Sequence, residues 1–152
     1  MRQRSAFSLL EVLVTVFIFA MALGFSLLYT QLGYLRADLK TQAAILETHL
    51  REAQSNATSG KEGGAFGIHF EETTYTLFTG TSYGVSDPGN FVVTLPDILT
   101  IGSVILQGAG SDVVFDAPLG STDEFGTLEL SSSRTGQTII FIISALGHVS
   151  YE

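Results

Sequence analysis

Residues 7–30, FSLLEVLVTVFIFAMALGFSLLYT, decide the fold that we expect for this chain. Fourteen of the seventeen residues from 12 to 28 are hydrophobic, and no charged residue occurs from 12 to 35. A bilayer core requires about 20 mostly apolar residues, because a helix rises about 1.5 Å per residue. Residues 7–30 are therefore predicted to form a transmembrane helix.

The chain of 152 residues has room for one globular domain beyond this segment. Residues 1–6 (MRQRSA) form a short basic leader, and residues 31–57 are predicted to continue the helix as an amphipathic half. In that half, small and apolar residues recur at spacings of three and four, which is typical of one buried stripe. The stripe comprises Leu32, Leu35, Leu39, Ala43, Leu46, Leu50, Ala53 and Ala57.

Residues 58–152 hold fourteen of the sixteen glycines and all three prolines, which marks a turn-rich β unit. Gly60 is the expected C-cap of the helix. Alternating apolar residues predict strands in this unit, and the first two are expected to pair as a hairpin. These strands cover residues 65–70, 73–79, 90–95, 98–101, 103–107, 112–116, 126–131, 137–143 and 147–151. The nearly continuous apolar run at 138–143 predicts a central strand covered on both faces. The fold class is thus α+β, with a long helix packed on an antiparallel β-rich head.

The charges are distributed unevenly along the chain. Arg2 and Arg4 precede the apolar segment, so the N-terminus is expected in the cytoplasm and the head outside the inner membrane. Residues 58–152 carry eleven acidic residues against Lys61 and Arg134. Such a surface repels phosphates, and nucleic acid is therefore excluded as an expected partner.

Glu11 is the most informative single residue, because it lies inside the apolar run. A carboxylate within a membrane helix costs roughly 2.5–3.5 kcal/mol on insertion scales unless it is paired. Two interpretations stay open for Glu11 on this basis. It is a functional group, or it lies at the level of the cytoplasmic headgroups and reaches water.

The leader MRQRSA followed by FSLLE resembles the signature of the type IV pilin and type II secretion pseudopilin superfamily. The resemblance implies cleavage by prepilin peptidase between Ala6 and Phe7, N-methylation of Phe7, and alignment of the subunit in a filament by Glu11. It also implies assembly with other pilin-like subunits on an inner-membrane platform, which produces an extracytoplasmic filament. The family usually has glycine before the cut, whereas this chain has Ala6.

The residues support this implied role of Glu11. Cleavage would expose an α-amino group on Phe7, and such groups titrate near pH ~8. Positions 7 and 11 lie one helical turn apart, so Glu11 can meet this amine or that of a neighbouring subunit. Either pairing offsets much of the cost of holding two charges in apolar surroundings.

Three segments are similar to H-type minor pseudopilins and related minor pilins: LREAQSNATSGK (50–61), the GIHF…YTLF hairpin and the final IIFIISALGHVSYE (139–152). Other interpretations of the N-terminus stay open. The sequence Ala20-Met21-Ala22 fits a secretory signal that would release a protein beginning at Leu23. The segment could also remain uncut as a simple anchor for a binding or sensing head that does not polymerise.

No motif for catalysis, cofactor binding or metal binding is found. The histidines His49, His69 and His148 fall on three different segments without metal-ligand spacing. Four acidic residues around Gly120 lack the spacing of a calcium loop and are expected to be solvated. These are Asp112, Asp116, Asp123 and Glu124. The sequence therefore predicts a structural protein, not an enzyme.

Overall fold

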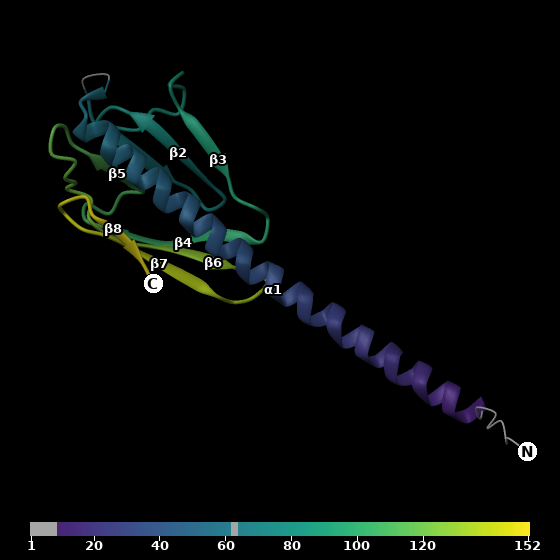
Figure 1. Cartoon of the computed structure of the whole chain (residues 1–152). Coiled ribbons are helices and arrows are strands. Elements are labelled where there is room, and N and C mark those ends of the chain that lie inside the picture. Colours follow the sequence, from purple (N-terminus) through teal and green to yellow (C-terminus); the bar gives the residue numbers. More distant parts are fainter. Residues whose placement is uncertain (1–8, 62–63) are drawn as a thin grey trace, which may run out of the picture. The chain divides into compact units, whose positions relative to one another are not determined.

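The computed structural model describes residues 9–61 and 64–152, with the side chains of residues 26–37 left aside (Figure 1). The leader 1–6 and Phe7 lie outside the described residues. The chain divides into two compact units, residues 1–37 and residues 38–152. One helix, α1 (Leu9–Thr58), contributes to both units.

Helix α1 is continuous over fifty residues because its sequence contains no proline. It ends at Thr58, one residue beyond the predicted end. Gly60 then adopts a positive φ of 68°, and its N–H donates to the carbonyl of Ala57 at 3.1 Å. Glycine enters this left-handed region without a Cβ penalty, so the prediction of Gly60 as the C-terminal cap is confirmed.

The second unit contains two antiparallel sheets of four strands each (Figure 1). Sheet A has the order β3-β2-β1-β5, and sheet B has the order β4-β6-β7-β8. The strands are β1 (Phe66–Phe70), β2 (Thr74–Thr79), β3 (Phe91–Thr94), β4 (Leu99–Leu106), β5 (Asp112–Phe115), β6 (Gly126–Ser132), β7 (Thr138–Ile143) and β8 (Val149–Tyr151). The α+β class is therefore confirmed.

Strand pairing follows the sequence closely at the first hairpin. β1 and β2 pair antiparallel as the predicted hairpin, in the register Phe66↔Thr79 to Phe70↔Tyr75. The predicted strands 98–101 and 103–107 are instead a single strand, β4. The pairing of β4 with β6 shifts between Ile101 and Val104, and this irregularity explains why the alternation was broken there in the sequence.

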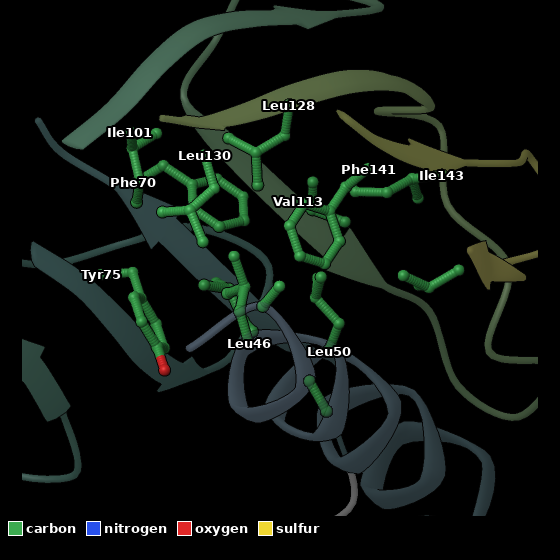
Figure 2. Packing of buried hydrophobic residues seen from close by; sticks show 14 of the residues in the cluster. Leu46, Leu50, Phe70, Tyr75, Ile101, Val113, Leu128, Leu130, Phe141 and Ile143 are labelled. Atoms are coloured by element: carbon green, nitrogen blue, oxygen red, sulfur yellow. The ribbon is translucent and has the colours of Figure 1, made fainter. Parts of the chain in front are cut away.

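One hydrophobic core joins both sheets to the second half of α1 (Figure 2). Leu46 and Leu50 of α1 point toward Tyr75 and Phe70 of sheet A and toward Phe141 of sheet B (Figure 2). Every described residue of the predicted apolar stripe is buried: Leu39, Ala43, Leu46, Leu50, Ala53 and Ala57. Residues 38–58 are therefore part of the core of the head.

The prediction that β7 is covered on both faces is wrong. Ile139, Phe141 and Ile143 are buried, whereas Thr138 and Ile142 are exposed and Ile140 is half-buried. β7 lies between β6 and β8, so its backbone is paired on both sides although its outer face is open. Isoleucine favours strands through its β-branched side chain even on a partly solvated face, and this preference produced the misleading continuous run.

Candidate functional site: the apolar part of the N-terminal helix

Residues 9–25 of α1 present an apolar surface on all sides. Every side chain in this range is exposed. The large hydrophobic side chains among them are Leu9, Leu10, Val12, Leu13, Val14, Val16, Phe17, Ile18, Phe19, Met21, Leu23 and Phe25. A contiguous apolar surface of this extent is typical of a protein–protein or membrane contact.

Glu11 is the one charged residue in this range. It lies two residues after Leu9, the first described residue of α1. Its side chain is exposed beside Leu10 and Val12, and within residues 9–61 and 64–152 no ion pair of Glu11 is found. One turn further on, the hydroxyl of Thr15 donates to the carbonyl of Val12 at 2.9 Å, so this second polar group is satisfied within the helix.

The predicted cleavage junction, Ala6–Phe7, lies outside the described residues, and so does the amine that cleavage would create. The structure thus places Glu11 on an otherwise apolar surface but tests neither the cut nor the pairing with Phe7. In the described part of the chain, no helix has the combined length and hydropathy of a membrane span.

Comparison with known proteins identifies the class to which this N-terminal segment corresponds. Residues 1–27 match the family model described as the prokaryotic N-terminal methylation motif. The motif is the type IV pilin and pseudopilin signal. A motif of this kind is typical of prepilin-peptidase substrates, and it implies pilin-type assembly, membrane anchoring and display outside the cell. No curated protein and no solved structure matches the chain.

The three histidines lie apart in the head, and two of them contact neighbouring side chains. The ring Nδ1 of His49 lies 2.8 Å from the hydroxyl of Tyr75. Burial raises the pKa of the Tyr75 hydroxyl to about 12. His69 is hydrogen-bonded to Asp112 through Nδ1 and stacks on Tyr83 with ring centroids 4.0 Å apart. These contacts fasten α1 to sheet A and the loop after β2 to the outer face of sheet A.

Two of the four acidic residues around Gly120, Asp112 and Glu124, have hydrogen-bond partners. Glu124 Oε2 accepts hydrogen bonds from the Val114 backbone N–H and the Thr122 hydroxyl, at 3.3 and 3.2 Å. The carboxylate of Asp112 is bonded to His69. Throughout the described residues, no group of three or more acidic or histidine side chains is placed to hold a metal ion. Sequence reasoning missed the bond of His69 with Asp112 because it joins two strands that are distant in the chain.

A cavity of about 230 Å³ lies between the last turns of α1 and sheet A. Ala53 and Asn56 line it from the helix, and Leu77 and Phe91 line it from the strands. Ligand pockets usually measure about 300–1,000 Å³, so this space is smaller than the pocket of an ordinary small-molecule site. The apolar surface of residues 9–25 is the main candidate for function because the methylation motif covers it.

Proposed function

We propose that this chain is a minor structural subunit of a type IV pilus-like or type II secretion pseudopilus-like filament. Prepilin peptidase cuts between Ala6 and Phe7, Phe7 becomes the N-methylated first residue, and the helix then joins a bundle of related helices. Before assembly the subunit is anchored once in the inner membrane, with the N-terminus in the cytoplasm and the head outside. The observation that carries this proposal is the methylation motif at residues 1–27.

The exposed surface of residues 9–25 supports assembly through the helix. This surface surrounds the helix, so it needs an apolar environment on every side. Lipid supplies such an environment before assembly, and neighbouring helices supply it afterwards. Moving the helix from lipid to other helices costs little hydrophobic free energy, so the specific contacts decide the arrangement. Repeated head-to-tail contacts do not close on themselves and produce a filament.

Glu11 supplies one such specific contact. A single carboxylate on an apolar helix is stabilised in a filament when the amine of a processed Phe7 lies beside it. A helix displaced along its axis would leave the carboxylate and the amine unpaired, so the pairing defines the axial register of the subunit. The partner amine belongs to the same subunit or to its neighbour.

The decisive experiment follows processing and assembly in one strain that contains prepilin peptidase and the inner-membrane platform. We expect the intact mass to show loss of residues 1–6 and gain of one methyl group. Glu11→Val should be processed normally but fail to enter sheared surface filaments, whereas the matched variant Thr15→Val, one turn away, should assemble like the wild type.

Three outcomes would contradict the proposal. A mass that still includes residues 1–6 would favour a permanently anchored binding or sensing head. A chain that begins at Leu23 would indicate a secretory signal. Normal assembly of Glu11→Val would remove Glu11 from the mechanism while leaving the processing step intact. A processed wild-type chain that never leaves the membrane fraction would favour the anchored binding domain.

A further inference from the structure

Strand β3 forms an open edge of sheet A. It pairs with β2 on one side only and lies at the margin of the sheet (Figure 1). Its first two side chains, Phe91 and Val92, are 59% and 57% exposed. An apolar edge strand of this kind is a template for pairing with another strand, because its unpaired N–H and C=O groups point outward.

The register identifies which backbone groups are unpaired. The N–H of Leu95 donates to the carbonyl of Thr73 at 2.9 Å, so Leu95 faces β2. Backbone groups alternate between the two sides of a strand, so Val93 and Phe91 also bond toward β2. The N–H and C=O groups of Val92 and Thr94 consequently point away from the sheet.

The edges formed by β4 and β5 are obstructed within the head. At β5, the outward N–H of Val114 donates to Glu124. At β4, the N–H of Ile101 donates to the carbonyl of Glu72 at 2.8 Å, and the register shift breaks the regular edge. Natural proteins protect edges by such irregularities and local partners. The edge formed by β8 is only three residues long.

We propose that β3 is a contact between heads, in which β3 of a second copy of this chain pairs with it in antiparallel orientation. With Val93 opposite Val93 of the second copy, Val92 lies opposite Thr94 and Thr94 opposite Val92. This register pairs every outward N–H and C=O of the two residues with a group of the other copy. The edge is therefore complementary to itself.

Charge favours the same occupant. Residues 88–96 carry no charge, although residues 58–152 hold eleven acidic residues and two basic ones. Two copies would repel each other through most acidic surfaces, whereas the uncharged edge lets them approach. Val92 and Phe91 can then be covered by apolar atoms of the second copy.

The contact is short, because Pro88 and Pro96 flank the strand and proline cannot donate to a ladder. Only the four residues of β3 can pair, so we expect a weak dimer that forms when copies are concentrated together. A two-fold contact closes after two copies. It is consequently distinct from the polymerising contact of the helix and does not require leader cleavage.

Disulfide crosslinking of the purified full-length chain in detergent tests this contact. The chain contains no cysteine, so single cysteines can be placed without background. In the proposed register, Val93 of the two copies forms a directly opposed, non-hydrogen-bonded pair, whose Cα atoms lie about 4.5 Å apart. This distance permits a disulfide. The control is Val85→Cys, at an 83% exposed position in the loop after β2.

We expect Val93→Cys to form the disulfide dimer at least tenfold faster than Val85→Cys, although Val93 is the less exposed site. Adding Val92→Pro, which removes an outward N–H and no bond to β2, should reduce the rate to that of the control. Val92→Lys should also reduce the rate to that of the control, and it replaces the proline variant in the test if that variant fails to fold.

Equal rates for Val93→Cys and Val85→Cys would overturn the proposal. So would a fast dimer that persists when Val92 is changed to Lys in a folded chain. The same variants in membranes of the producing cells distinguish a different occupant. If the Val93→Cys chain formed a disulfide there with another protein, and no dimer with itself, the edge would belong to that protein and the second copy would be refuted.

Discussion

Replacing Gly147 by alanine should destabilise the head strongly, because three segments meet at this residue. Gly147 has a φ of +80°, and it lies in the turn that precedes β8. A Cβ there would overlap the carbonyl oxygen of Gly120 and lie 2.5 Å from Nε2 of Gln54. That amide donates to the carbonyls of Gly120 and Leu146, at 3.2 and 3.3 Å, and so joins α1 to both loops.

The expected cost has two parts. Placing a Cβ in the left-handed region costs about 1–2 kcal/mol. The methyl group must also separate the Gly120 loop from the Gly147 turn, which weakens the two bonds of Gln54. Each neutral hydrogen bond contributes about 0.5–1.5 kcal/mol. Gly147→Ala should therefore lower the free energy of unfolding by about 3 kcal/mol.

Gly136→Ala is the matched control. Gly136 has a φ of +64°, but a Cβ there would meet nothing within 4 Å. It should cost only the backbone part, about 1–2 kcal/mol. Denaturant unfolding of the full-length chain in detergent, followed by near-UV circular dichroism of tyrosine, measures both variants. If the two variants were equally stable, the close approach of the two loops and α1 at Gly147 would be refuted.

Two further substitutions test the packing of α1 on the head. Leu50→Ala removes a fully buried side chain and should cost about 2–5 kcal/mol in the same assay, whereas Ile45→Ala, at a 37% exposed position, should cost much less. Equal losses would exclude residues 38–58 from the core. Tyr75, whose pKa burial raises to about 12, stays neutral in the folded head while the unfolded chain ionises near pH 10. Below pH 10 Tyr75 is protonated in both states, so its ionisation does not change the free energy of unfolding. At pH 11 the free energy of unfolding is lower by about 1.4 kcal/mol, because the unfolded state has released the proton that the folded state keeps. Tyr75→Phe should show a smaller loss between pH 10 and 11 than the wild type, and an unchanged loss would contradict the burial of the hydroxyl.

Local pattern predicted most elements of the head. Leu128 and Leu130 are buried on one face of β6, as the alternation in GTLELS indicated. The stripe from Leu39 to Ala57 was readable because helix periodicity and burial coincide. Both patterns arise between neighbours in sequence, so they are visible without knowledge of the three-dimensional arrangement.

The arrangement of the strands was beyond sequence reasoning. β5 pairs with β1 across more than forty residues, and β4, which follows β3 in the chain, belongs to the other sheet. Such choices depend on how two sheets and one helix share a single core, and any one strand carries little information about them. The bond of His69 with Asp112 depends on the same pairing of β5 with β1.

The division between the two parts of α1 explains how one helix can serve both stability and assembly. Residues 38–58 bury one stripe against the two sheets, so the head would lose part of its hydrophobic core without them. Residues 9–25 bury nothing within the described chain, so any contact that they make lowers the free energy of an assembly without a cost to the fold of the head. Substitutions in residues 9–25 should therefore alter assembly at constant stability of the head, whereas substitutions in the stripe should lower its stability first. A Glu11→Val chain whose head unfolds earlier than the wild type would contradict this division, since Glu11 is exposed and lies outside the compact unit that forms the head.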